Sequence, residues 1–264
     1  MTEYSPEVAV INDGTFALDP GAIFGTSPKN VWSKYYDTTP DYRIKLNTNL
    51  TIIEDNNKFY LLDGGIGGQI SEYYRKWFNA ESSEELKAYM KKKRIKKFES
   101  IFHTHLHFDH TGHSFTDLSS SRSVASITEV NNFQNPNDMA KASYANQDIS
   151  TTNLSPVFTD TRVGNFTLKM TGGHTTGHMA IFYRNGGTKI LYAGDLFPST
   201  FHLKPSRITA IDQEPLKSFQ VKKELLSMAI KESWILVLSH DTEEKAIRVS
   251  GDVDNPKYTS WEGT

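Results

Sequence analysis

The stretch FHTHLHFDHTGH, residues 102–113, contains five of the nine histidines of the chain and one aspartate. It overlaps the end of the strand-like segment ESIFHTH at 99–105, so we expect the cluster to lie in a loop where a strand ends. Imidazole and carboxylate groups together suit borderline divalent metals, zinc foremost. The pattern HxHxDH at 105–110 therefore predicts that two histidines bind one ion while the aspartate and the last histidine face a second.

Three further candidate ligands lie at the ends of predicted strands. They are His174 after FTLKMTGG (166–173), Asp195 at the end of TKILYAGD (188–195) and His240 at the end of WILVLSH (234–240). Any one of them alone could be a turn or capping residue. As a set at strand ends, they indicate the ligands that the four loop residues cannot supply.

The chain is predicted to form one domain over residues 1–264. Its 264 residues and 37% hydrophobic content are sufficient for one large core. Segments rich in β-branched and aromatic residues between turn formers predict strands. These are LTIIED (50–55), KFYLLDGG (58–65), ESIFHTH, SVASIT (123–128), FTLKMTGG, MAIFYRN (179–185), TKILYAGD and WILVLSH.

Two local patterns refine this organisation. LTIIED and KFYLLD, separated by two asparagines, predict a hairpin. Helical patterns cover 69–78, 83–93 and 214–232. The last of them places six apolar residues roughly on one side: Leu216, Phe219, Val221, Leu225, Leu226 and Ala229. Strands in two groups with helices outside favour an α/β fold of four layers, an αββα sandwich.

The overall composition excludes several classes of partner and chemistry. A net charge of −2 and no basic excess argue against a nucleic-acid partner, and KKKRIKK at 91–97 fits the cation-rich end of a helix. The lack of cysteine removes disulfides, thiolate ligands and a cysteine nucleophile. With no signal-peptide pattern and no apolar run long enough to cross a bilayer, we expect a cytoplasmic protein with no membrane partner.

The histidine motifs resemble those of the metallo-β-lactamase superfamily. HTHLHFDHTGH (103–113), GGHTTGH (172–178), AGD (193–195) and SHD (239–241) follow one another in that family's order, and DGGIG (63–67) resembles its first motif. The resemblance covers nearly the whole chain and implies an αββα fold with a dinuclear site.

By motif, the resemblance assigns every ligand of two metal sites. His105, His107 and His174 would hold the first metal, Asp109, His110 and His240 the second, and Asp195 would bridge them. Asp63 matches an aspartate that orients a ligand histidine. His178 is expected to lie beside the ligands as a structural hydrogen-bonding residue, and His103 and His113 to support the site or pack around it. Two divalent ions, most simply Zn²⁺, are the implied cofactors.

Such a pair of metals predicts hydrolysis by a bridging hydroxide, with the metals polarising a carbonyl or phosphoryl oxygen. No protein nucleophile is needed, in keeping with the missing cysteine and the missing GxSxG motif. Asp109 is the predicted catalytic residue, placed to bind metal and to pass a proton to the leaving group.

Three further segments resemble the quorum-quenching N-acyl-homoserine lactonases and the related methyl-parathion-hydrolase-like branch. They are GAIFGTSPKNVWSKYY (21–36), YRIKLNTNLTIIEDNNKFYLLDGGIG (42–67) and AGDLFPSTFHL (193–203). The expected activity is therefore opening of the lactone ring of N-acyl-homoserine lactones. A phosphotriester or aryl-ester hydrolase, a glyoxalase II-like thioesterase, and a metal-binding protein without activity remain as alternatives.

The predicted substrate pocket uses aromatic residues that precede the metal loop, together with one residue within that loop and one histidine after it. The candidates are Phe24, Trp32, Tyr73, Trp77, Phe108 and His202. One departure from the resemblance is Pro198, because some lactonases carry a tyrosine three residues beyond the bridging aspartate. The expected partner is a small lactone, and the chain could form a homodimer.

Overall fold

Two seven-stranded sheets form the centre of the computed structural model, which describes residues 6–68, 70–145 and 153–263. The strand order is β4-β1-β2-β3-β5-β6-β7 in the first sheet and β14-β13-β12-β11-β10-β9-β8 in the second. The first sheet consists of β1 (Glu7–Leu18), β2 (Ile44–Asp55), β3 (Lys58–Leu62), β4 (Glu81–Ser82), β5 (Ser100–Phe102), β6 (Arg122–Ser126) and β7 (Leu154–Val157). The second consists of β8 (Thr161–Val163), β9 (Phe166–Met170), β10 (Met179–Asn185), β11 (Thr188–Tyr192), β12 (Ile235–Val237), β13 (Ala246–Gly251) and β14 (Pro256–Ser260).

The two sheets pack face to face around one apolar layer. Ile53 and Phe102 of the first sheet share this layer with Leu168, Ile181 and Tyr192 of the second, and each is almost completely buried. Burying a side chain of this size stabilises the fold by about 1.5–3 kcal/mol relative to exposure. Apolar alternation along the strands therefore explains why the sheets close on each other.

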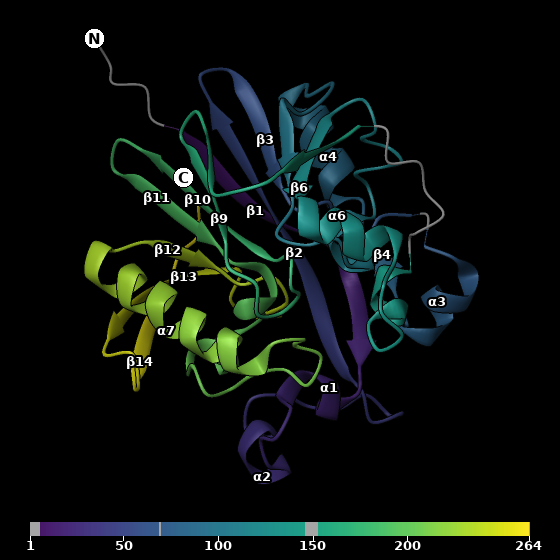
Figure 1. Ribbon diagram of the computed structural model, residues 1–264, viewed down its shortest axis with the longest axis vertical. Helices are drawn as coiled ribbons and strands as arrows, with labels where there is room; N and C mark the ends of the chain where they lie inside the picture. The colour runs from purple at the N-terminus through teal and green to yellow at the C-terminus, as the bar shows by residue number, and fades with distance from the viewer. Residues whose placement is uncertain (1–5, 69, 146–152, 264) are drawn as a thin grey trace.

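Helices cover the two outer faces. The helix α4 (Glu85–Lys93) places Leu86 against Leu50 and Ile101 of the first sheet, and α7 (Pro215–Glu232) places Leu226 against Leu236 of the second. Figure 1 shows α7 lying across the second sheet, with α4 and α6 on the side of the first. The predicted αββα sandwich is confirmed.

Short helices form the connections between these layers. They are α1 (Pro20–Phe24), α2 (Lys29–Trp32), α3 (Glu72–Trp77), α5 (Phe108–Thr111) and α6 (Ile127–Gln134), with 3-10 turns at Lys141–Tyr144, Gly194–Leu196 and Thr200–Leu203. Most of them follow strand ends, which is also where the histidine motifs lie. No helix in the described part of the chain is both long and apolar enough to cross a membrane.

The predicted hairpin is confirmed as β2 and β3. These strands pair antiparallel with Asp55 opposite Lys58, and Asn56 and Asn57 have φ angles of 52° and 61°. A two-residue hairpin loop requires such left-handed backbone, which asparagine tolerates better than most residues. The other predicted strands are present too, but ESIFHTH is shorter than expected because the chain leaves β5 after Phe102 to enter the metal loop.

The predicted apolar side of the last helix is partly wrong. Leu216 is 81% exposed, and the buried side is formed by Ser218, Lys222, Leu225, Leu226 and Ala229. At about 100° per residue, Leu216 points about 160° away from Ser218, so it cannot share that side. The cation-rich helix end is confirmed for Lys91, Lys92 and Lys93, which form the last turn of α4, whereas residues 95–97 lie beyond the helix.

Candidate metal centre

The metal centre forms where loops from the two sheets meet. The loop after β5 and the short helix α5 supply four donors from the first sheet. The loops after β9, β11 and β12 supply three more from the second sheet. The seven predicted ligands are brought together, and all are buried: His105, His107, Asp109, His110, His174, Asp195 and His240.

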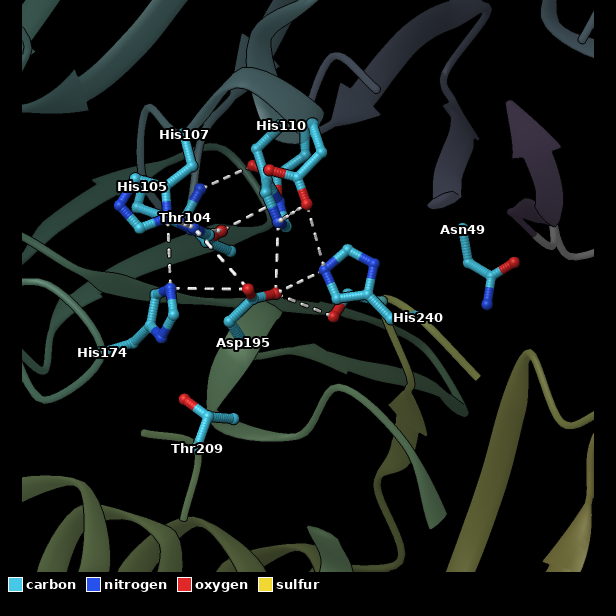
Figure 2. Close-up of polar contacts among 12 residues, drawn as sticks. Asn49, Thr104, His105, His107, His110, His174, Asp195, Thr209 and His240 are labelled. Atoms are coloured by element: carbon cyan, nitrogen blue, oxygen red, sulfur yellow. Dashed lines mark hydrogen bonds and ion pairs between the residues drawn. The ribbon is translucent and has the colours of Figure 1, made fainter. Parts of the chain in front are cut away.

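The first group of donors consists of His105, His107 and His174. The Nδ1 atom of His107 lies 3.1 Å from Nε2 of His105 and 3.3 Å from Nε2 of His174. The Oδ2 atom of Asp195 completes the group at 3.4 Å from His174 and 4.0 Å from His105. Three histidines and one carboxylate oxygen therefore face a common point, as Figure 2 shows.

The second group shares Asp195 with the first. Its Oδ1 atom lies 2.8 Å from Nε2 of His240 and 3.1 Å from Nε2 of His110. The Oδ2 atom of Asp109 lies 3.4 Å and 3.6 Å from the same two nitrogens. Asp195 thus offers one oxygen to each group, which is the geometry of a bridging carboxylate (Figure 2).

These separations fit divalent ions of the size of zinc. With metal–ligand bonds of about 2.1 Å, two ligands of a tetrahedral ion are separated by about 3.4 Å. The donor separations in both groups scatter around this length. The residues therefore fit two ions without rearrangement of the loops.

The hydrogen bonds of the ring nitrogens give a second test of fit. Nδ1 of His240 donates to the carbonyl oxygen of Asn47 at 2.7 Å, and Nδ1 of His110 pairs with Asp63 at 2.6 Å. Among the described residues, the buried Nε2 atoms of both rings have no hydrogen-bond partner, and both point at carboxylate oxygens. In a neutral ring this places lone pair against lone pair, a repulsion that a cation would remove.

A network of buried groups orients the other ligands. Asp63 accepts from the backbone N–H and the hydroxyl of Thr104, and that hydroxyl lies 2.9 Å from Nδ1 of His105. Nδ1 of His174 lies 2.9 Å from Asp212. Contacts of this kind fix the tautomer and direction of a metal-binding histidine. The structure places Asp63 where the sequence predicted it, against a ligand histidine.

Comparisons with known proteins agree with this geometry. A sequence model of the metallo-beta-lactamase superfamily matches residues 43–240. The chain belongs to this superfamily. No curated protein matches the sequence.

Solved structures share the overall fold. A probable metal-dependent hydrolase from Staphylococcus aureus is 27% identical, with a TM-score of 0.89 and 99% of each chain covered. AidC, a dizinc quorum-quenching lactonase with a product bound, is 16% identical with a TM-score of 0.77, covering 99% of this chain and 96% of that one. An N-acyl homoserine lactone hydrolase with N-hexanoyl-L-homoserine at its metal centre is 19% identical with a TM-score of 0.69, covering 90% of this chain and 94% of that one.

Membership in the superfamily and the complete His/Asp groups make the chain a metal-dependent hydrolase. In such an enzyme the ligand imidazoles must be neutral to bind metal. Burial, together with the neighbouring histidines, lowers the pKa of both His105 and His107 well below the ordinary value. These two rings are therefore ready to bind metal at neutral pH.

The second group has the opposite electrostatics in the metal-free protein. Burial by itself would lower the pKa of His110, but Asp109, Asp195 and Asp63 outweigh it and raise that pKa well above its usual value. Burial is likewise outweighed at Asp195, whose pKa is held well below its usual value by His240 and the other surrounding histidines. Without metal, the second group therefore binds protons, and metal binding must release these protons.

An apolar cleft of about 190 Å³ opens onto the donors. Its inner end exposes His107, Asp109, Asp195 and His240. Its walls include Phe16, Leu18, Ile23, Phe78, Phe108 and Ile211. A neighbouring cleft of about 380 Å³ shares His107, Met139, Ser143 and Ile211 with it, so the two open on the same side of the centre.

The predicted substrate pocket needs correction, because only Phe108 of its six residues lines this cleft. Phe24 and Trp32 stack 5.0 Å apart in the core instead, behind Ile23. Nε2 of His202 donates to the carbonyl oxygen of Ile23 at 2.9 Å. Phe24, Trp32 and His202 therefore pack next to Ile23 of the cleft wall but do not line the cleft themselves.

The other two predicted pocket residues lie outside the cleft. Tyr73 and Trp77 are 66% and 58% exposed on α3. Their rings pack on each other, with centroids 6.1 Å apart. α3 is too short to bury a full helical side, so its large aromatic residues remain at the surface.

The remaining histidines have structural contacts. Nδ1 of His178 lies 2.7 Å from the hydroxyl of Thr171, and its ring is 5.5 Å from that of His105, beside the ligands as predicted. His103 donates from Nδ1 to the carbonyl oxygen of His110. His113 bridges Asp13 and Asp117 at 2.9 Å and 3.1 Å.

Sequence reasoning missed several residues that hold the site. Asp212, Glu129, the Asn47 carbonyl and Ser239, which donates to Asp195 at 3.0 Å, were not singled out. Asp212 alone carried a signal, as an acidic residue directly after the mainly apolar stretch ITAI (208–211) and before α7. The others are visible only once distant segments are folded together.

Proposed function

We propose that the chain opens the lactone ring of N-acyl-homoserine lactones at a dinuclear zinc centre. The observation that carries this proposal is the cleft, whose lining divides into mainly apolar walls and the metal donors His107, Asp109, Asp195 and His240. An N-acyl-homoserine lactone has the same division, with a hydrocarbon chain at one end and a ring ester at the other. Pockets of this kind use a few polar groups to orient a mainly apolar ligand.

Two structural neighbours support this choice of substrate. One is described as a dizinc quorum-quenching lactonase and the other as an N-acyl homoserine lactone hydrolase. Their sequence identities of 16% and 19% make the shared fold the basis of the comparison. The cleft of this chain supplies the independent argument for the substrate.

Each part of the site has a role in the proposed reaction. Two bound divalent ions would supply Lewis acidity for the ester carbonyl and lower the pKa of bound water. Asp109 faces His110 and His240 on one side and the cleft on the other, so it is placed to take up a proton and deliver it to the leaving alkoxide. Phe108 and Leu18 exclude water from the acyl end.

A phosphotriester or aryl ester is the second candidate substrate, and Pro198 favours it. Pro198 lines the cleft, and its carbonyl oxygen accepts from the backbone N–H of His240 at 2.8 Å. A proline has no hydroxyl to donate to a substrate carbonyl. A substrate polarised by the metals alone would suit the site as well.

Proton release from weakly buffered, zinc-loaded protein tests the proposal. N-hexanoyl- and N-decanoyl-homoserine lactone would be compared with paraoxon and a thioester, using His107→Ala as the control. We expect acid production from the lactones that is lost in the control. A higher kcat/KM for paraoxon than for either lactone would replace the proposal with the second candidate, and elemental analysis would check the two zinc ions.

A further inference from the structure

Glu129 is a buried carboxylate that lies outside the group of metal donors. It belongs to the first turn of α6 and is completely buried. Its Oε1 atom accepts from the backbone N–H of Leu106 at 3.0 Å and from the hydroxyl of Tyr144 at 2.7 Å. Its Oε2 atom accepts from the hydroxyl of Thr175 at 2.6 Å and from the side-chain amide of Asn132 at 3.4 Å.

Two of these donors belong to the loops that carry the first metal group. Leu106 lies between His105 and His107, and Thr175 directly follows His174. One carboxylate therefore joins two ligand loops that come from different sheets. A shift of Glu129 would move the backbone on which all three histidines depend.

Tyr144 extends the same contact to a ligand ring. Its ring meets that of His107 edge to face, with centroids 4.8 Å apart, while its hydroxyl is held by Glu129. Nε2 of His107 has no hydrogen-bond partner in the described structure. The packing of Tyr144 thus takes the place of the polar contact that orients the other ligand rings.

The approach of α6 to the His174 loop leaves no space for adjustment. The hydroxyl of Ser126 caps α6 by accepting from the backbone N–H of Glu129 at 3.0 Å and donates to the carbonyl oxygen of Gly177 at 2.5 Å. A Cβ atom on Gly177 would lie 2.3 Å from the backbone nitrogen of Glu129. The position of Glu129 is therefore set by backbone contacts as well as by its own hydrogen bonds.

We propose that Glu129 is a positioning residue of the first metal group, which joins the loops that carry His105, His107 and His174 in the geometry for one ion. The second group has other orienting contacts, Asp63 for His110 and the Asn47 carbonyl for His240. None of the four hydrogen bonds of Glu129 reaches a donor of that second group. Loss of Glu129 therefore weakens one metal site and spares the other.

Zinc binding to Glu129→Gln, measured by competition with a chromophoric chelator, tests this inference without any substrate. Glutamine can keep one oxygen for the Leu106 amide and the Tyr144 hydroxyl. It then presents an NH₂ group to Thr175 and Asn132, which donate to the other oxygen of Glu129. Removing an orienting contact of a metal ligand weakens binding about 10–100-fold. We expect one of the two zinc dissociation constants to rise by about that factor and the other to change less than about twofold.

Two further variants identify the affected site. In His174→Ala, which lacks a ligand of the first group, adding Glu129→Gln should leave the affinity for the remaining zinc unchanged. Asp55→Asn is the matched control, because Asp55 is a buried carboxylate that accepts from Asn165 and Asn185 away from the metal loops. It should leave both zinc affinities unchanged.

The inference is overturned if Glu129→Gln changes neither zinc constant, or changes both equally. It is also overturned if the substitution weakens the zinc that His174→Ala retains. Because no substrate enters the measurement, these results do not depend on whether the chain hydrolyses lactones.

Discussion

In the proposed reaction, Asp109 has two roles, as a metal ligand and as a proton carrier. Its carboxylate lies 3.4 Å from His240 and 3.6 Å from His110, and it also borders the cleft. Burial raises its pKa, against the lowering effect of these two histidines. Metal binding needs an oxygen atom as the ligand, whereas proton transfer needs an oxygen atom that can accept a proton. A carboxylate provides both.

Asp109→Asn keeps an oxygen for the metal and removes the proton acceptor. We expect kcat for lactone opening to fall by about 10²–10⁴-fold, the usual contribution of general acid–base catalysis. Elemental analysis must show two metals per chain, so that loss of metal does not explain the effect. Unchanged turnover by fully loaded protein would rule out this role for Asp109.

Lys222 is a fully buried cation inside α7. Burial lowers its pKa from 10.5 to about 7, and Nζ donates to the carbonyl oxygen of Arg207 at 2.5 Å. Between pH 7 and pH 10 the unfolded chain therefore binds a proton that the folded chain does not. The free energy of unfolding should rise with pH across this window, by at most about 1.4 kcal/mol per pH unit from this one group.

Lys222→Met removes that dependence. We expect the free energy of unfolding of the variant, measured in urea at pH 7, 8 and 9, to rise less steeply with pH than that of the wild type. Lys223→Met is the control, since Lys223 is half-exposed and its loss should leave the slope unchanged. Parallel curves for Lys222→Met and the wild type would show that Lys222 stays protonated in the fold.

The donors of the metal centre could be predicted from sequence, whereas most of their supports could not. Histidine and aspartate at strand ends are local features that a single chain displays. The contact of Glu129 with Leu106 spans 23 residues, and that of Asn47 with His240 spans 193. Only the fold creates such contacts, so no local pattern indicates them.

At the scale of elements, the cleft is built largely by segments that carry no histidine motif. Phe16 and Leu18 come from the end of β1, and Ile23 comes from α1. β1 is not predicted from the sequence, because the dipeptide Asp13–Gly14 is typical of a turn. In the structure this pair lies at an irregularity between Asn12 and Thr15 of a continuous strand, where Gly14 pairs with Ser82 of β4.

Leu18→Ala tests whether the end of β1 forms part of the acyl site. Leu18 is half-buried, lines the cleft and is not a metal donor. Removing its apolar surface should raise KM for N-decanoyl-homoserine lactone by up to about tenfold, because each buried CH₂ contributes about 0.8 kcal/mol. The N-hexanoyl substrate should be affected less.

Trp77→Ala provides the matched comparison, since Trp77 is exposed on α3 outside the cleft. It should leave KM for both lactones unchanged. Equal effects of Leu18→Ala on the two chain lengths would place the acyl chain elsewhere, with the neighbouring cleft at Met139 as the next candidate.

At the scale of the whole molecule, the metal centre joins the two sheets at one end of the sandwich. Four donors follow β5 of the first sheet, and three follow strands of the second. Protein contacts reinforce this junction, since Asn49 of β2 donates to the carbonyl oxygens of Leu238 and Asp241 at 2.9 Å each. Bound metals would add to these contacts and hold the sheets together.

Removing the metals should therefore destabilise the entire fold. A site saturated at 100 times its dissociation constant adds about 2.7 kcal/mol to the free energy of unfolding, which corresponds to a Tm increase of about 5 °C or more in a chain of this size. We expect chelator-treated protein to lose that increase and Zn²⁺ to restore it. His240→Ala, which lacks one donor, should gain less from Zn²⁺ than the wild type.

The Zn²⁺-dependent increase in Tm should also shrink as the pH is lowered from 7.5 to 5.5. The carboxylates around His110 raise its pKa in the metal-free protein, so Zn²⁺ must displace a proton from this ring, and the free-energy cost of that displacement increases as the pH falls. The pKa of His240 is raised as well, by Asp195 and Asp109 against the effect of burial. Equal Tm values with and without Zn²⁺ at pH 7.5 would mean that Zn²⁺ does not bind the folded chain more tightly than the unfolded chain, which would contradict the metal centre.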